Sequence, residues 1–351
     1  MGSFRRAVVR TGLETLYFSG AHVLMRPFVG GMGVILTLHH VRPPRPDPFQ
    51  PNRLLEVSPR FFARTVRRLK AHYDLVSLDE MHRRVVEGDC KRRFACLTFD
   101  DGYRDVMKYA WPVLREHDVP FALYVATSFP DRLGVLWWLG LEAVIARNAR
   151  IGLVMNGEDR HFDCATVEEK RHLFDGLYWW LRSLETYDEL VHAIRDLCAR
   201  YQVDLAEICA RQCMSWEELG QMAEDPRVTI AAHTVNHPML SKVPEKAARA
   251  EMEMSRSVIE AALGVRPAHL SYPVGDPTSV GPREYRIAGE LGFKTAVTTN
   301  PGMLFSAHAQ HLTALPRVSL NGEFQQRRYV KVLMSGAATA LWNGFRRVKA
   351  A

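Results

Sequence analysis

The chain has 351 residues, of which 47% are hydrophobic and 24% are charged, and its formal net charge is +7. This length and composition allow one large domain or two ordinary ones with a full hydrophobic core, and they exclude a low-complexity protein. The positive charge suits an anionic surface such as lipid headgroups or acidic glycans. The sequence has no run of five basic residues and no recognised nucleic-acid-reading module, so we expect no nucleic-acid partner.

The cysteines and the amino terminus indicate the cellular compartment. Six cysteines are scattered along the chain, unlike those of a disulfide scaffold, so we expect buried free thiols in a reducing compartment. Arg10 and Glu14 interrupt the apolar run that a secretory signal needs, and no stretch approaches the roughly 20 apolar residues of a membrane span. We therefore expect a cytoplasmic protein, with peripheral contact at the inner membrane face as a further option. The cysteines are Cys90, Cys96, Cys164, Cys198, Cys209 and Cys213.

Residues 1–30 predict an amphipathic helical segment with a basic face. Such a segment either packs on the body of the protein or lies in a membrane interface, and both interpretations remain open. A second amphipathic helix is expected over residues 326–351. The arginines of the first segment are Arg5, Arg6, Arg10 and Arg26.

Short apolar runs that suit buried strands follow residue 30. Helical patterns lie between them, such as the one that starts at the cap Ser58-Pro59 and the long stretch Glu245–Leu263 that Gly264 closes. This alternation predicts a mostly parallel sheet, and seven or eight strands favour a barrel over residues 31–325. The predicted strands are Val34–Leu38, Asp74–Leu78, Phe94–Phe99, Phe121–Ala126, Val228–Ala232, His269–Tyr272, Lys294–Thr298 and Leu312–Val318.

Residues from about 130 to 220 break the alternation. They contain the pairs Trp137-Trp138 and Trp179-Trp180, together with helical patterns at Glu168–Arg182 and Tyr187–Tyr201. We expect a helical insertion carried on the barrel. Its indole rings either line a sugar cleft or belong to the core of the insertion.

Polar side chains follow five of the predicted strands directly. Because parallel strands of a barrel end on one face, these groups are expected to gather where barrel enzymes place their active sites. The groups are His39-His40, Asp100-Asp101-Gly102, Thr127-Ser128, His233 to His237, and Thr299-Asn300.

Two of these groups have the chemistry of a catalytic cation site. The adjacent carboxylates of Asp100 and Asp101 repel each other unless a cation is present or one is protonated. His233 and His237 are four residues apart and can reach one metal ion from a single turn of chain. Two imidazoles and one carboxylate leave coordination positions open, and the second aspartate then serves as a general base for water.

The segments Leu97–Tyr103 and His233–His237 resemble the first two motifs of the polysaccharide deacetylases, carbohydrate esterase family four. The resemblance covers roughly residues 31–128 and 214–320. It implies a distorted (β/α)7 barrel, with Asp100 as the general base. It also implies that Asp101, His233 and His237 bind a divalent metal ion, usually zinc.

Leu270–Gly275 resembles the third motif of the same family, in which a backbone N–H helps to hold the oxyanion. This role is assigned to the N–H of Tyr272. The arginine usual in this motif, which supports the base, is absent here. Arg317, at the end of another predicted strand, is the candidate replacement.

Many members of the family place the general acid in a Leu-x-His motif near the carboxyl end, and none occurs after residue 300. Leu36–Pro43 instead resembles a subgroup in which this strand has moved to the amino terminus. That alignment makes His39 the acid and His40 an outward neighbour. The alternative is that His308 or His311 folds back to act as the acid.

The resemblance implies a hydrolase that removes N-acetyl groups from a polysaccharide, an oligosaccharide or the sugar of a glycolipid. One alternative is a related metal-dependent amidohydrolase acting on a cyclic imide or another non-sugar amide. Another is a non-catalytic barrel that binds glycans or membranes. The complete set of Asp100, Asp101, His233 and His237 favours the first interpretation.

Overall fold

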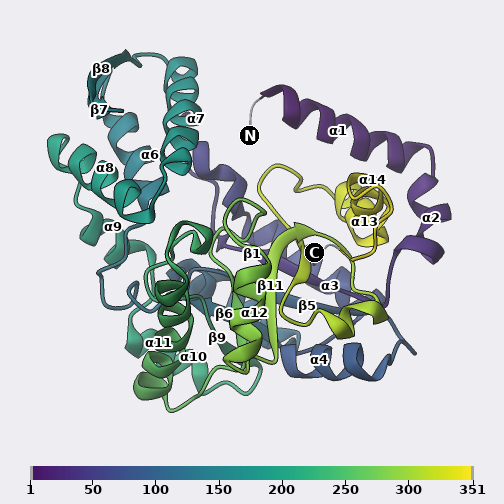
Figure 1. Cartoon of the computed structure of the whole chain (residues 1–351). Coiled ribbons are helices and arrows are strands. Elements are labelled where there is room, and N and C mark those ends of the chain that lie inside the picture. Colours follow the sequence, from purple (N-terminus) through teal and green to yellow (C-terminus); the bar gives the residue numbers. More distant parts are fainter. Residues whose placement is uncertain (1–2, 349–351) are drawn as a thin grey trace.

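The computed structural model describes residues 3–348, and its centre is a closed barrel of seven parallel strands (Figure 1). The barrel strands are β1 (Gly33–Leu38), β5 (Phe94–Phe99), β6 (Phe121–Val125), β9 (Val228–Ala232), β10 (His269–Ser271), β11 (Thr295–Pro301) and β12 (Leu315–Ser319). Their order around the barrel is β1, β12, β11, β10, β9, β6 and β5. The predicted (β/α)7 barrel is confirmed.

The barrel closes between β1 and β5, which pair over their whole length from Gly33 opposite Phe94 to Leu38 opposite Phe99. The other edge of β5 is shared. The short strand β4 (Asp74–Leu75) pairs with its beginning, and β6 pairs with its end. A strand near the amino terminus therefore completes the barrel, and the ends of β1 and β5 lie side by side.

Helices and short turns surround the barrel (Figure 1). Ser58 caps α3 through its side chain with Pro59 in the first turn, and Gly264 ends α11 in the left-handed conformation. A second small sheet pairs β2 (His40–Val41) with β3 (Glu56–Val57) directly after β1. The surrounding elements are η1 (Pro51–Leu55), α3 (Pro59–His72), α4 (Leu78–Glu87), η2 (Val106–Ala110), α5 (Trp111–Glu116), η3 (Leu240–Lys242), α11 (Glu245–Leu263), α12 (Pro282–Glu290) and η4 (Ser306–Gln310).

Every residue of β1, β5 and β6 is buried, which explains their continuous apolar sequences. One face of each strand fills the barrel and the other packs against helices. Phe62 of α3 meets Phe99 of β5 edge-on with ring centroids 5.9 Å apart, and Phe99 meets Phe121 of β6 at 5.7 Å. These contacts join the helical layer to the strand ends that carry the polar groups.

The insertion follows β6 and extends away from the barrel at the upper left of Figure 1. It is mostly helical, but it also contains an antiparallel hairpin of β7 (Arg150–Met155) and β8 (Glu158–Asp163) that the prediction of a helical insertion missed. Asn156 and Gly157 turn the hairpin with φ of 55° and 81°, and this dipeptide is a strong hairpin signal. The helices of the insertion are α6 (Trp137–Arg147), α7 (Val167–Ser183), α8 (Tyr187–Arg200) and α9 (Leu205–Gln212), whereas α10 (Trp216–Ala223) returns to the barrel and packs on α11 and β9.

The two ends of the chain pack against each other. The amino-terminal segment forms α1 (Ser3–Phe18) and α2 (Ala21–Val29), which contact α13 (Arg327–Ser335) and α14 (Ala337–Trp342). The prediction of one helix over residues 326–351 is wrong, because Gly336 separates α13 from α14 at φ 80°, where a Cβ would lie 2.2 Å from the Val29 carbonyl oxygen. Residues 1–2 and 349–351 of the two predicted segments lie outside the described residues.

No helix within residues 3–348 combines the length and the apolar character needed to cross a membrane.

Candidate active site

Asp101, His233 and His237 meet at the carboxyl ends of β5 and β9. The Nε2 atoms of both histidines lie 3.3 Å from Oδ1 of Asp101. One ligand atom from each residue lies within 4.8 Å of the other two, and all three residues are buried. The three side chains can therefore share one cation.

Two tight turns aim these side chains. Asp101 and Gly102 adopt left-handed backbone after β5, with φ of 69° and 62°. Thr234 and His237 do the same after β9 at 65° and 57°, and the Thr234 hydroxyl accepts a hydrogen bond from the His237 N–H at 3.1 Å. Left-handed backbone at a β-branched residue costs on the order of 1–3 kcal/mol, and such strain concentrates at functional sites.

The donor set fits a divalent cation. Oδ1 of Asp101 is buried and has no hydrogen-bond partner among the described residues, although two imidazole nitrogens surround it. Nδ1 of His233 lies 2.7 Å from the Ser271 carbonyl oxygen, which directs Nε2 toward Asp101. Burial alone would raise the pKa of Asp101, but His233 and His237 hold it well below its ordinary value, so the carboxylate is ionised. An anionic oxygen and two imidazoles are ligands that zinc prefers.

Asp100 points to a different partner. Its two carboxylate oxygens accept hydrogen bonds from the two terminal nitrogens of Arg317, both at 2.7 Å. The side chain of Arg317 is fully buried. Burial would raise the pKa of Asp100, but the charge and hydrogen bonds of Arg317 outweigh it and lower the pKa below its ordinary value. Asp100 is therefore an ionised carboxylate outside the three-residue cluster.

Several supporting residues were not assigned from the sequence. The Ser271 hydroxyl lies 3.0 Å from an Arg317 nitrogen and 3.5 Å from Asp100, and Thr298 accepts from Arg317 Nε through its carbonyl at 2.9 Å. Glu251 of α11 holds the turn after β9 by accepting two backbone N–H groups at 2.8 and 2.9 Å. Ser271 lies inside the third quoted motif, so its position at a strand end was the available signal.

His39 and His40 have different surroundings. Burial lowers the pKa of the His39 ring, while the nearby charges of Asp101 and Asp100 act in the opposite direction, so His39 lies in the electric field of the cluster. His40 is only 1% exposed. Its Nδ1 lies 2.7 Å from an Asp105 oxygen, and its ring stacks on Tyr103 at 3.6 Å between centroids. His40 is therefore a buried packing residue; of the surrounding helices or solvent that an outward neighbour was expected to face, it contacts the segment that leads into η2.

His308 lies far from the strand ends that carry the site. It belongs to η4, and the loop before η4 pairs with the beginning of β1, where Leu304 exchanges backbone hydrogen bonds with Met32 and Gly33. Burial lowers the pKa of His308 to about 4, and its Nδ1 accepts from the Phe305 N–H at 3.0 Å. His308 and the adjacent His311 are thus at the amino-terminal end of the barrel, which excludes both as the acid.

The role expected for the Tyr272 N–H is wrong. This N–H donates to the Val297 carbonyl oxygen at 3.1 Å, as part of the pairing between β10 and β11, and so cannot also bind an oxyanion. The Tyr272 hydroxyl donates to the Thr313 carbonyl oxygen at 2.8 Å. Two residues further on, Val274 has left-handed backbone at φ 61°, and its N–H has no acceptor within residues 3–348.

Aromatic residues form a wall beside His237. Its ring lies 5.8 Å from Phe129 and 5.1 Å from Trp138, measured between centroids. Trp138 donates through Nε1 to the Tyr103 hydroxyl at 3.2 Å. Of the four tryptophans considered for a sugar cleft, Trp138 borders the site. Trp179 is half exposed on α7, and the Arg182 guanidinium lies over its ring.

Three comparisons place these observations among known proteins. A family model described as "Polysaccharide deacetylase" matches residues 87–153 and 179–296, more than half of the chain. None of the curated proteins searched matches significantly.

Solved structures share the fold at low sequence identity. The deacetylase PplD of Streptococcus pyogenes, in complex with acetate, is 18% identical with a TM-score of 0.55, over 82% of this chain and 92% of that one. IcaB from Ammonifex degensii is 17% identical with a TM-score of 0.52, over 87% and 96%. A de-N-acetylase from Aggregatibacter actinomycetemcomitans is 13% identical with a TM-score of 0.52, over 86% and 99%. The family match and the shared barrel together show that the chain belongs to the polysaccharide deacetylase family, hydrolases that act on the amide bonds of acetylated sugars.

Proposed function

We propose that the protein removes N-acetyl groups from a glycan with one divalent cation, preferably zinc, held by Asp101, His233 and His237. The observation that carries the proposal is that the two adjacent aspartates have different partners. Asp101 lies between two imidazoles, whereas Asp100 is paired with Arg317 and remains outside that cluster. A metal-dependent hydrolase that activates water uses this combination of metal ligands and a separate base.

The residues of the chain have separate tasks in this reaction. A cation at the cluster would supply positive charge that polarises the acetamide carbonyl and acidifies a water molecule. Asp100 accepts the proton of that water, and Arg317 keeps the carboxylate ionised and oriented. His39 donates a proton to the departing amine. Acetate and a free amino sugar are the products, so one acetyl C–N bond is exchanged for one C–O bond.

We transfer the oxyanion role from Tyr272 to the N–H of Val274. Val274 follows Ser271 by three residues, in the turn that leaves β10 beside Asp100 and His233. Its unpaired N–H is the kind of donor that stabilises the negative oxygen of a tetrahedral transition state.

The test is acetate release from N-acetylglucosamine oligomers by protein stripped with a chelator, with and without added zinc. We expect release only with metal, and loss of release in Asp100→Asn. A cyclic imide and a simple acetamide, assayed in parallel, test the non-sugar amidohydrolase. No release from any substrate by the zinc-loaded protein would contradict the proposal and favour a non-catalytic barrel.

A further inference from the structure

The helices at the two ends of the chain carry an unusual share of exposed apolar side chains. Phe28 of α2 is 73% exposed and Trp342 of α14 is 53% exposed, although α2 and α14 pack together. These side chains are carried by helices that contact one another and by the segment after α14, and we call this surface the terminal face. Its members are Val8, Phe18, Val23, Leu24, Phe28, Leu341, Trp342 and Phe345.

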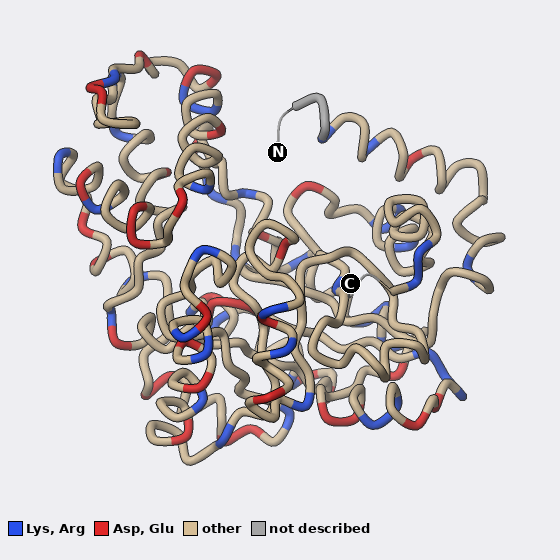
Figure 2. Tube along the Cα trace, viewed as in Figure 1, with Lys and Arg blue, Asp and Glu red and all other residues tan. Residues whose placement is uncertain are grey.

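The terminal face is basic as well as apolar. Neither residues 21–29 nor residues 336–348 contain an aspartate or a glutamate. They do contain Arg26, Arg346 and Arg347, all of which are exposed. Figure 2 shows this lack of acidic residues along α2 and α14, in contrast to the mixed charges of α11. A ligand for this face should therefore combine apolar groups with negative charge.

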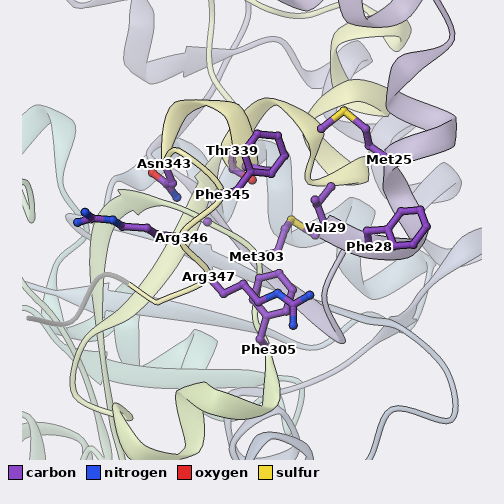
Figure 3. A pocket seen from close by; sticks show the side chains of 12 residues that line it. Met25, Phe28, Val29, Met303, Phe305, Thr339, Asn343, Phe345, Arg346 and Arg347 are labelled. Atoms are coloured by element: carbon purple, nitrogen blue, oxygen red, sulfur yellow. The ribbon is translucent and has the colours of Figure 1, made fainter.

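A groove of about 290 Å³ opens on this face (Figure 3). Met25, Phe28 and Phe345 line it from the terminal helices and the segment after α14, and Met303 and Phe305 line it from the barrel. The Arg347 guanidinium lies over the Phe305 ring, 5.2 Å from its centroid. An adjoining hollow of about 260 Å³ shares Phe28, Phe305 and Arg347 with the groove. The groove thus has an apolar lining with a cation beside it.

We propose that the terminal face docks on an anionic phospholipid bilayer, with an acyl chain entering the groove and Arg346 and Arg347 contacting phosphates. Exposed apolar side chains gain free energy on entering the headgroup region, and arginines near an anionic leaflet add electrostatic attraction. The face lies on the surface of the bilayer and does not span it, because none of the helices within residues 3–348 is suited to span.

The charge pattern argues against a second copy of the chain as the occupant. A symmetric dimer through this face would bring Arg26, Arg346 and Arg347 toward the same residues of the partner. Residues 21–29 and 336–348 offer no carboxylate to pair with them, and Glu14 of α1 is already bound to Arg328 and Tyr329, so the contact would desolvate like charges. An anionic leaflet satisfies the same arginines without this penalty.

The proposal is independent of the deacetylation proposed above. The terminal helices lie on the right in Figure 1, and the insertion that follows β6 at the site end of the barrel lies at the upper left. Among the residues that the structure describes, no hydrogen bond, ion pair or ring contact joins a terminal-face residue to Asp100, Asp101, His233 or His237. Docking and catalysis can therefore fail separately.

The test is flotation of the full chain with vesicles of phosphatidylcholine alone or mixed with phosphatidylglycerol. We expect binding to the mixed vesicles that weakens as salt is raised. Arg346→Gln with Arg347→Gln should weaken binding about 30-fold, from roughly a fivefold loss for each arginine. Phe28→Ser with Trp342→Ser should also weaken vesicle binding. This variant should lose the part of the binding that remains at high salt, because that part comes from apolar contact.

Matched controls come from exposed positions elsewhere. Arg150→Gln with Arg160→Gln, both in the β7–β8 hairpin, and Val154→Ser with Val265→Ser should bind like the parent. Acetate release from soluble oligomers should be unchanged in all four variants. No flotation of the parent with anionic vesicles, or equal flotation of the terminal-face variants, would overturn the proposal. So would a concentration-dependent dimer, seen by ultracentrifugation and abolished by the same substitutions, in a chain that does not float.

Discussion

Arg317 and Asp100 form a two-point ion pair in the barrel interior, with both N–O distances at 2.7 Å. Arg317 lies on β12 and Asp100 follows β5, and β1 lies between these two strands in the sheet. The arginine thus reaches past a neighbouring strand to hold the carboxylate. The Arg317 nitrogen Nη1, which binds one Asp100 oxygen, also donates to the Thr98 hydroxyl at 3.3 Å. This second hydrogen bond fixes the orientation of the guanidinium group.

Arg317→Met should both destabilise the fold and shift the pH dependence of activity. Removing one partner of a buried pair typically costs about 3–5 kcal/mol, because the other charge remains buried. The pKa of Asp100 is held low by Arg317, so without the arginine it rises. The base is active when ionised, and the acidic limb of the rate profile should therefore move to higher pH. Arg317→Lys keeps the charge and should shift the acidic limb of the rate profile less. If the acidic limb does not move in Arg317→Met, Arg317 does not hold the pKa of Asp100 low.

Asp101→Asn and His233→Ala should lose the metal ion, whereas Asp100→Asn should keep it. The first two substitutions remove a ligand from the buried cluster, and the third alters a carboxylate that contacts Arg317 instead. Zinc content by mass spectrometry after dialysis distinguishes them. Asp100→Asn should still lose activity by about 10²–10⁴-fold, the usual contribution of a general base. Zinc loss in Asp100→Asn equal to that in Asp101→Asn would place both aspartates on the metal.

His39→Ala should slow cleavage of an amide far more than cleavage of the matching ester. An amine needs a proton in order to leave, whereas an alkoxide leaves more readily, so loss of the acid is felt mainly on the amide. The comparison uses N-acetyl and O-acetyl substrates in acetate-release assays. Equal losses on both substrates would show that His39 has another role.

His40→Ala is the matched control for His39→Ala. It leaves Asp105 without its 2.7 Å partner and removes the ring that stacks on Tyr103. Asp105 keeps the hydrogen bond from the Val41 N–H at 3.2 Å, but one lost hydrogen bond costs about 0.5–1.5 kcal/mol, so this variant should unfold at lower urea concentration. Its rates on amide and ester should change by the same factor, because it lacks a direct part in protonating the leaving group.

Asp225→Asn should show a pH-dependent loss of stability. Burial would raise the pKa of Asp225, but hydrogen bonds from Arg227 and Trp111 outweigh it and lower the pKa to about 2. Since this value lies below the ordinary 3.8, the stabilisation is present at neutral pH and is lost as pH falls toward 2. Urea unfolding should show a deficit of about 1–2 kcal/mol at pH 7 that shrinks below about pH 4.

Asp118→Asn is the control for this prediction. Asp118 also contacts Arg227, at 3.4 Å, but its side chain is 84% exposed. Exposed pairs contribute little, so its stability should match the parent at every pH. An Asp225→Asn deficit that is the same at pH 7 and pH 3 would mean that lost packing, and not the ionised carboxylate, is the cause.

The sequence by itself determined the elements that depend on short-range patterns. Apolar runs predicted every strand of the barrel to within a few residues, because a strand buried on both faces is mostly apolar; the buried Arg317 inside β12 is the main exception. The polar residues just after those runs predicted that Asp101, His233 and His237 would gather, since parallel strands end on one face. The missed hairpin at Asn156-Gly157 also had a local signal.

Only the tertiary structure decided which groups are already occupied. Asp100 and Arg317 are 217 positions apart, and nothing in either segment specifies a two-point pair between them. The Tyr272 N–H looked available in its motif, but the neighbouring strand supplies Val297 as its acceptor. His39 and His40 are adjacent in sequence, yet one lies in the electric field of Asp101 and Asp100 and the other stacks on Tyr103. Hydrogen-bond partners and burial come from segments distant in the chain, so a local pattern can nominate a residue but cannot show whether its donor or acceptor is free.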